Sequence, residues 1–317
     1  MAKGSVLLTG AAGFIGSHLT ERFLKEGYQV LGVDNFLTGR EANLREAMKN
    51  ENFRFVKADV TERFDFTNPF GGNFNWVMHF ACPASPTDFE NLALEILQVD
   101  SIGTLNALEF TRKQGASFFL ASTSEVYGDP LVHPQTEEYW GNVSSTGPRS
   151  CYDEAKRFSE AAVMVYQRKY GVDARIVRIF NTYGPRMRLN DGRVVPELCS
   201  QALKGKKLTL CGDGKQTRSF CFVHDLVDGI FRMTQIRENM PINVGNPVEW
   251  ELNDFARVVQ KLSGSDVGIE YIPARPDDPR RRCPDISKAK RLLQGWEPKV
   301  SLEEGLRETM ESFRAEL

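Results

Sequence analysis

Short apolar runs alternate with amphipathic stretches along the first 180 or so residues of the chain. The apolar runs have the length of buried strands, and the stretches between them repeat apolar positions at helical spacing. The expected strands are Ser5–Thr9, Gln29–Val33, Phe53–Val56, Trp76–Phe80, Ser117–Ala121 and Arg175–Ile179. Strands that alternate with helices predict an α/β fold, a doubly wound parallel sheet with helices on both faces.

The amphipathic stretches around Leu94–Arg112 and Asp153–Tyr170 are the longest predicted helices in this region. They carry more apolar surface than one sheet face needs, which suggests core packing or a dimer interface built from both helices. After Asn181 the alternation breaks up into short elements separated by Gly and Pro. Further helices are expected near Val195–Leu203, Asp225–Thr234, Asn253–Leu262 and Ser301–Phe313. A smaller, mixed lobe is therefore predicted to follow the sheet.

The first strand runs directly into a glycine-rich turn that opens a helix. The turn comprises Gly10, Gly13, Phe14, Ile15 and Gly16. Glycines there let the backbone approach a pyrophosphate at the helix N-terminus, where free N–H groups and the helix dipole favour an anion. The Gly-x-x-Gly-x-x-Gly spacing differs by one residue from the usual dinucleotide fingerprint, and glycines alone are a weak signal. The preceding strand and the following helix predict a Rossmann-type site.

Asp34 ends the second strand about 20 residues after the turn, where a carboxylate can accept hydrogen bonds from an adenosine ribose. A 2′-phosphate would face like charge there, so NAD is favoured over NADP as the cofactor. Asp59 and Val60 follow the third strand and are predicted to lie beside the adenine ring. Asp34 and Asp59 could instead be ordinary turn residues at strand ends.

Tyr152 and Lys156 are four residues apart and share one face of a predicted helix. A nearby ammonium stabilises phenolate and is expected to lower the Tyr152 pKa toward working pH, which would make it a base for a sugar alcohol. This spacing alone also occurs on solvated helix faces. Thr123 and Glu125 follow a predicted strand and would lie at the carboxyl-end rim of the sheet, where ligands gather. Their presence there favours a catalytic role for Tyr152 and Lys156.

Composition limits the class of protein. The 317 residues are 41% hydrophobic and 26% charged, enough for a large core in one two-lobed unit. A net charge of -2 gives no reason to expect nucleic acid or an anionic membrane. No apolar run approaches the ~20 residues of a membrane span and the first strand begins too early for a signal peptide, so a soluble cytoplasmic protein is expected. Six cysteines without Cys-x-x-Cys pairs predict free thiols and no metal site.

A family resemblance extends essentially from end to end. The narrow motifs are Ala81-Cys82-Pro83-Ala84-Ser85-Pro86, Thr123-Ser124-Glu125-Val126-Tyr127-Gly128-Asp129-Pro130, Gly147-Pro148-Arg149-Ser150-Cys151-Tyr152-Asp153-Glu154, Arg178-Ile179-Phe180-Asn181-Thr182-Tyr183-Gly184-Pro185-Arg186-Met187, Gln216-Thr217-Arg218-Ser219-Phe220 and Arg282-Cys283-Pro284-Asp285-Ile286. With them the chain resembles the extended short-chain dehydrogenase/reductase superfamily and, within it, the UDP-glucuronate decarboxylases. The resemblance implies an NAD-binding domain over residues 1–185 and 220–247. It places the nucleotide-sugar lobe at 186–219 and 248–317.

The resemblance also implies roles. Tyr152 would take the C4 hydroxyl proton while NAD takes the hydride, with Lys156 on the nicotinamide ribose and Thr123 on the reacting oxygen. The 4-keto uronic acid would then lose carbon dioxide, and reduction at C4 would give UDP-xylose. Glu125 and Arg282 match positions at the sugar carboxylate end, and Asn181 and Arg218 match positions on the diphosphate. Further substrate contacts are expected from Pro83, Ser85, Ser124 and Arg186.

Some positions depart from the family pattern. Cys82, Phe89, Ser144-Ser145-Thr146 and Ala155 stand where Ser, Tyr, Asn-Pro-Ile and Gly are usual. A 4,6-dehydratase would need an acid where Ser124 stands, and a 4-epimerase usually has a small neutral residue at Glu125. A non-catalytic NAD-binding protein would need no base at Tyr152. These alternative functions are less favoured than a decarboxylase. A homodimer is also expected.

Overall fold

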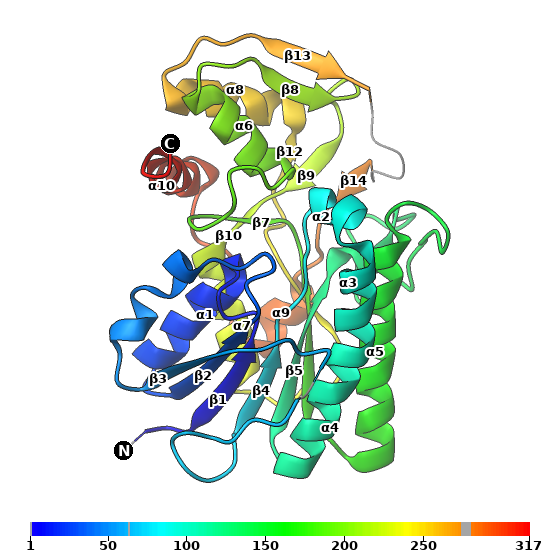
Figure 1. Cartoon of the computed structure of the whole chain (residues 1–317). Coiled ribbons are helices and arrows are strands. Elements are labelled where there is room, and N and C mark those ends of the chain that lie inside the picture. Colours follow the sequence, from blue (N-terminus) through cyan, green and yellow to red (C-terminus); the bar gives the residue numbers. More distant parts are fainter. Residues whose placement is uncertain (1, 63, 274–279) are drawn as a thin grey trace.

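A seven-stranded parallel sheet forms the centre of the computed structural model, which describes residues 2–62, 64–273 and 280–317 (Figure 1). The strand order is β11-β6-β5-β4-β1-β2-β3, which confirms the predicted doubly wound α/β class. The strands are β1 Ser5–Thr9, β2 Gln29–Asp34, β3 Phe53–Lys57, β4 Trp76–His79, β5 Ser117–Thr123, β6 Ala174–Ile179 and β11 Ile242–Val244. The order reverses between β1 and β4, so a crevice for ligands opens at the carboxyl ends of these strands.

Side-chain alternation along the strands builds two separate cores. Val6 and Leu8 of β1 belong to one apolar cluster, and Leu7 between them belongs to the other. The first cluster packs under α1 Phe14–Lys25 and α7 Val223–Met233, and the second under α4 Thr104–Gln114 and α5 Ser150–Tyr170. The period of two along a strand therefore accounts for helices on both faces of the sheet.

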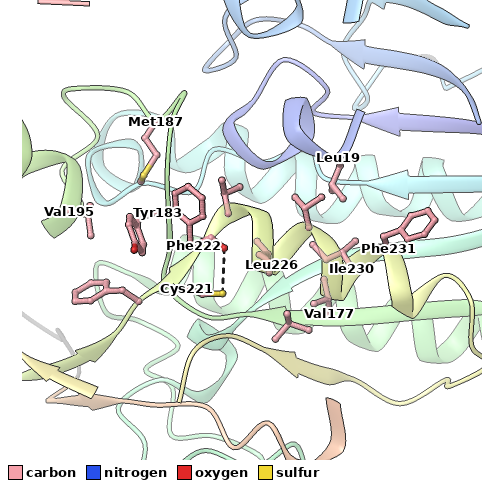
Figure 2. Packing of buried hydrophobic residues seen from close by; sticks show 14 of the residues in the cluster. Leu19, Val177, Tyr183, Met187, Val195, Cys221, Phe222, Leu226, Ile230 and Phe231 are labelled. Atoms are coloured by element: carbon pink, nitrogen blue, oxygen red, sulfur yellow. Dashed lines mark hydrogen bonds between the residues drawn. The ribbon is translucent and has the colours of Figure 1, made fainter. Parts of the chain in front are cut away.

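The first core continues beyond the sheet into the later elements. Figure 2 shows Leu19, Leu226 and Ile230 packed together, with Met187 and Val195 farther along the same cluster. The same cluster reaches α6 Val194–Leu203, α8 Leu252–Ser263 and α10 Leu302–Arg314. Because these elements share one apolar core with the sheet, the crevice at the strand ends has a fixed wall on its far side.

Short strands and helices complete the upper part of Figure 1. One three-stranded sheet has the order β12-β9-β14, and β13 pairs with β8 in parallel. Apart from the segment between Ala93 and Gly103, the elements not yet named are η1 Glu41–Leu44, η2 Ala47–Lys49, α2 Pro86–Asn91, η4 Ser124–Tyr127, β7 Thr182–Tyr183, β8 Leu208–Cys211, β9 Thr217–Ser219, β10 Cys221–Phe222, β12 Glu249–Glu251, β13 Ile269–Ile272, β14 Arg281–Arg282 and α9 Ser287–Leu292. Most are too short for periodicity to reveal them in a sequence.

The predicted helix over 94–112 is not uniform. It consists of α3 Ala93–Gln98, a π-helical turn η3 Val99–Gly103, and α4. Single π-turns inside helices are rare and frequently occur at functional sites. Across the described residues, no helix is both long enough and apolar enough to cross a membrane.

Candidate active site

One large cavity lies at the carboxyl ends of the strands, against the upper elements. It encloses about 580 Å³, a volume within the range of small-molecule sites. Thr123 and Glu125 reach it from the end of β5 and the start of η4, Tyr152 and Lys156 from α5, and Arg282 from β14. The structure thus brings together side chains that are up to 159 positions apart in the chain.

The glycine turn between β1 and α1 lies at one end of this cavity, together with Phe14 and Ile15. Gly10 has a φ of +72°, and a Cβ there would lie 2.6 Å from the Phe80 carbonyl oxygen. A Cβ on Gly16 would lie 2.0 Å from the Gly10 carbonyl oxygen. Glycine is required at both positions, at Gly10 by conformation and at Gly16 by close packing of the helix on the turn. Gly13 is the N-cap of α1 and lines the cavity.

Asp34 closes a smaller adjoining cavity at the end of β2. Its carboxylate accepts hydrogen bonds from the backbone N–H groups of Ala12, at 2.9 Å, and Phe36, at 2.8 Å. Burial raises its pKa, and these two N–H groups oppose that rise. Each oxygen accepts one backbone bond and keeps acceptor capacity toward the cavity, which suits a ribose diol. The glycine cradle and this acceptor together fit a dinucleotide.

The remaining residues predicted to contact the cofactor line the same smaller cavity. Asp59 accepts hydrogen bonds from Thr61 and from the Asn35 side chain, and Val60 lies beside it. Pro83, predicted on the substrate side, lines this smaller cavity and not the large one. Its neighbour Cys82 lines both cavities.

Tyr152 and Lys156 lie on one buried face of α5, as their spacing predicts. The Lys156 ammonium is 5.7 Å from the centre of the Tyr152 ring, and Phe89 stacks on that ring at 4.9 Å. Lys156 also donates a hydrogen bond to the Ala121 carbonyl at 3.2 Å and forms an ion pair with Asp100 at 2.9 Å. Asp100 comes from the π-helical turn and is fully buried.

The predicted lowering of the Tyr152 pKa is wrong for this arrangement. Burial raises the pKa of Tyr152 above its ordinary value, and the Lys156 ammonium opposes this without overcoming it. Cys82, Asp100 and Glu125 raise the pKa further. The spacing of Tyr152 and Lys156 shows their proximity, but it contains no information on burial or on the carboxylate that compensates the ammonium.

Glu125 is held by two arginines. Arg282 donates to both of its carboxylate oxygens, at 2.5 and 2.7 Å, and Arg149 donates to one of them. Burial would raise the pKa of Glu125, but the Arg149 and Arg282 guanidinium groups outweigh burial and hold it below its usual range. Glu125 is therefore an ionised carboxylate that joins α5 and β14 to the end of β5.

The other residues predicted to bind the substrate differ in the contacts that their side chains make within the protein. Ser85, Ser124, Asn181, Arg186 and Arg218 all line the large cavity. Ser85 caps α2 and accepts a hydrogen bond from Arg188. Arg186 forms an ion pair with Glu21 of α1 at 2.6 Å. Arg186 thus ties the glycine helix to the far wall of the cavity.

Sequence reasoning missed two charged residues. Arg149 contacts Glu125, and Asp100 contacts Lys156. Arg149 lies three residues before Tyr152, so helical spacing offered a signal. No local signal marks Asp100, because it looks like one more polar position in an amphipathic helix.

Comparison with known proteins places this geometry in a family. Residues 7–309 match the family model described as GDP-mannose 4,6 dehydratase. UDP-glucuronic acid decarboxylase 1 of Xenopus tropicalis is 48% identical over 98% of this chain and 72% of its own length. UDP-glucuronic acid decarboxylase 6 of Arabidopsis thaliana is 48% identical over 98% of this chain and 89% of its own length.

A solved structure shows the same architecture. UDP-glucuronic acid 4-epimerase from Bacillus cereus, in complex with UDP-glucuronic acid and NAD, superposes with a TM-score of 0.88 and 29% identity, covering 99% of this chain and 100% of the epimerase. The fold is therefore shared by epimerases and decarboxylases of nucleotide sugars. The higher sequence identity is to the decarboxylases. The chain belongs to the UDP-glucuronic acid decarboxylases, within the family described as GDP-mannose 4,6 dehydratase.

Proposed function

We propose that this protein converts UDP-glucuronate to UDP-xylose and carbon dioxide with NAD as a recycled cofactor. The observation that carries the proposal is the meeting of Tyr152, Lys156 and Thr123 with the Glu125–Arg282 pair in one cavity beside the glycine cradle. When bound, NAD would supply the hydride acceptor for oxidation at the sugar C4 and, in its reduced form, the hydride donor for the same carbon. The glycine turn would hold the pyrophosphate and Asp34 the adenosine ribose.

The side chains of the protein account for the proton steps. Tyr152, in its ionised phenolate form, accepts the proton of the C4 hydroxyl as that carbon is oxidised, and Thr123 donates a hydrogen bond to the same oxygen. The C4 ketone makes the C6 carboxylate a β-keto acid, so the C5–C6 electron pair moves into an enolate as carbon dioxide leaves. Thr123 and protonated Tyr152 stabilise the enolate oxygen by hydrogen bonds. A proton then adds to C5, and Tyr152 returns its proton to the C4 oxygen upon reduction.

The charged wall of the cavity supports decarboxylation over epimerisation. A 4-epimerase must let the 4-keto sugar present its other face, and an epimerase of a uronate must also prevent loss of the C6 carboxylate. Here Glu125 is ionised and buried against two arginines. Ser124, which has no acidic proton to give, stands where a 4,6-dehydratase needs an acid. Epimerisation of UDP-glucuronate is the second candidate, because the Bacillus cereus epimerase has the same fold.

The reaction is tested by incubating the purified protein with UDP-glucuronate and NAD and measuring product mass and cofactor absorbance. We expect UDP-xylose and carbon dioxide in equal amounts over many turnovers, without accumulation of NADH. An isomer of unchanged mass would identify an epimerase. Stoichiometric NADH release would contradict the closed cycle and identify a simple dehydrogenase.

The glycine cradle gives a prediction for cofactor binding. In Gly16→Ala the new methyl group would lie 2.0 Å from the Gly10 carbonyl oxygen, so the turn must shift. We expect the thermal stabilisation by NAD to be lost, with weaker binding by at least about tenfold, or 1.4 kcal/mol. Gly268→Ala is the matched control, because a methyl group at that position would have no neighbour within 4 Å. Equal NAD stabilisation in both variants would exclude the cradle as the pyrophosphate site.

We also propose that the protein is a homodimer. Apolar side chains on the outer face of α3, η3, α4 and α5 are exposed, and α4 and α5 lie side by side in Figure 1. They are Leu94, Leu97, Ile102, Leu105, Phe158 and Val165. Exposed apolar side chains on neighbouring helices fit a second copy of the same face. The mass in solution should be twice that of the chain and should halve in Phe158→Glu; a monomeric unmodified protein contradicts this.

We also propose which parts of the chain bind each ligand and in which compartment the protein works. Residues 1–185 and 220–247 would bind NAD, and residues 186–219 and 248–317 the nucleotide sugar. The six cysteines are free thiols in the structure. A reducing compartment keeps thiols in that state, which supports a cytoplasmic location.

A further inference from the structure

The π-helical turn η3 presents a buried carboxylate to the catalytic helix. Asp100 has no solvent exposure, and its Oδ1 lies 2.9 Å from the Lys156 ammonium. Its backbone carbonyl accepts a hydrogen bond from Ser159, one turn beyond Lys156, at 2.7 Å. Backbone and side chain of Asp100 are therefore both fixed to α5. A regular α-helical turn would rotate this position away from its present place, so the π-turn has a specific consequence.

A second contact fixes the other oxygen of this carboxylate. The Cys82 thiol donates a hydrogen bond to Asp100 Oδ2 at 3.1 Å. Burial, followed by the charge of Asp100, raises the pKa of Cys82 well above its ordinary value, so the thiol keeps its proton and remains a donor. Asp100 is thus held between a neutral donor on one oxygen and the buried ammonium of Lys156 on the other.

We propose that Asp100 is a positioning residue for the reaction: it anchors Lys156 and, by compensating the ammonium charge, sets the pH at which Tyr152 can accept a proton. The inference rests on the proposed role of Tyr152 as the base. Its basis is the buried chain of contacts from Cys82 through Asp100 and Lys156 to the Tyr152 ring.

The direction in which Asp100 shifts the ionisation of Tyr152 follows from the net charge of Asp100, Lys156 and Tyr152 together. With Asp100 ionised, Lys156 charged and Tyr152 neutral, the buried group has no net charge, and loss of the phenol proton leaves a net negative charge in a dry site. Without the Asp100 charge, the same loss of a proton converts a net positive group into a neutral one. The Tyr152–Lys156 pair therefore releases its proton at lower pH when Asp100 is neutralised.

Other titratable or charged groups near Tyr152 and Lys156 are present both in the unmodified protein and in a variant that lacks the Asp100 charge. His79 on β4 has its pKa lowered to about 3 by burial and by Lys156, so it is neutral at working pH. Glu125 from η4 raises the pKa of Tyr152, and Arg193 near α6 interacts with the same phenol. Replacement of Asp100 leaves these groups unchanged, so the pH shift reports on Asp100.

The test compares the pH dependence of kcat/KM for UDP-glucuronate in the unmodified protein, Asp100→Asn and Asp225→Asn. We expect the acidic limb of the profile to move to lower pH by about one unit or more in Asp100→Asn, the size of shift that a close charge produces. Asp225 is the control: it is a buried carboxylate on α7 that accepts hydrogen bonds from the Lys299 and Val300 backbone. Its replacement should lower thermal stability and leave the profile in place.

A measurement on the unmodified protein covers the case in which Asp100→Asn does not fold. Ultraviolet titration of the unmodified protein, with Tyr152→Phe subtracted, reports ionisation of Tyr152 alone. We expect no Tyr152 phenolate in the ligand-free protein near neutral pH. Phenolate at neutral pH, or an unshifted acidic limb in folded Asp100→Asn, overturns the proposal for Asp100. Failure of UDP-xylose formation in the unmodified protein would instead refute the proposed function.

Discussion

Replacing Tyr152 with phenylalanine is expected to lower turnover by about 10²–10⁴-fold, the usual contribution of one acid–base group. The change removes the phenol oxygen and keeps the ring that stacks on Phe89 at 4.9 Å. Folding and binding of the nucleotide sugar should therefore be retained. The loss should appear in kcat and kcat/KM together, because the proton transfer occurs only as the C4 oxygen reacts.

Tyr166→Phe is the matched control for this change. Tyr166 lies on the same helix, α5, and packs against the core on the α4–α5 face of the sheet, away from the cavity. Turnover should be unaffected by this replacement. Single-turnover measurements with bound NAD would show whether C4 oxidation itself is slowed in Tyr152→Phe. Near-normal turnover in Tyr152→Phe would exclude this residue as the base.

The second large effect is expected at the Glu125–Arg282 pair. The pair joins η4 to β14 through two hydrogen bonds of 2.5 and 2.7 Å, and Arg149 adds a third from α5. Glu125→Gln should slow carbon dioxide release by about 10²-fold, more than it weakens binding, because an ionised Glu125 near the substrate carboxylate favours departure of that charge as CO2. Arg282→Ala should impair turnover and affinity together, by about 2–5 kcal/mol in kcat/KM.

A purely structural role for this pair makes a different prediction. Breaking a buried ion pair by removing one partner costs about 3–5 kcal/mol of stability, whatever the chemistry of the site. If that were its only role, each single variant would unfold at lower temperature but release carbon dioxide normally per folded molecule. The double variant Glu125→Gln, Arg282→Gln removes both charges and should regain stability. Normal carbon dioxide release in that double variant would remove both residues from the catalytic site.

The observed pair also resolves an electrostatic difficulty in the sequence-based interpretation. A carboxylate beside a substrate carboxylate is unfavourable unless it is neutralised. Arg149 and Arg282 hold the Glu125 pKa below its usual range, so Glu125 remains ionised while its field is partly compensated. How much of that field the substrate carboxylate experiences is what the Glu125→Gln measurement determines.

Several features of the protein follow from the sequence because they depend on local periodicity. The apolar runs identified the strands of the main sheet except β11. The glycine spacing identified a turn in which Gly10 has a positive φ. The four-residue spacing placed Tyr152 and Lys156 on one face of a helix. Each of these inferences needs only neighbours in the chain.

The tertiary structure decided the charges around the proposed base. Asp100 lies 56 positions before Lys156, and Arg282 lies 157 positions after Glu125, so no local pattern relates either pair. The Tyr152 pKa has the opposite shift from the one predicted, because burial and compensation of Lys156 by Asp100 outweigh the nearby ammonium. Burial and charge pairing are properties of the packed molecule, in which segments distant in the chain exclude water together. The sequence determined which groups can do chemistry; the packing around them decided their ionisation.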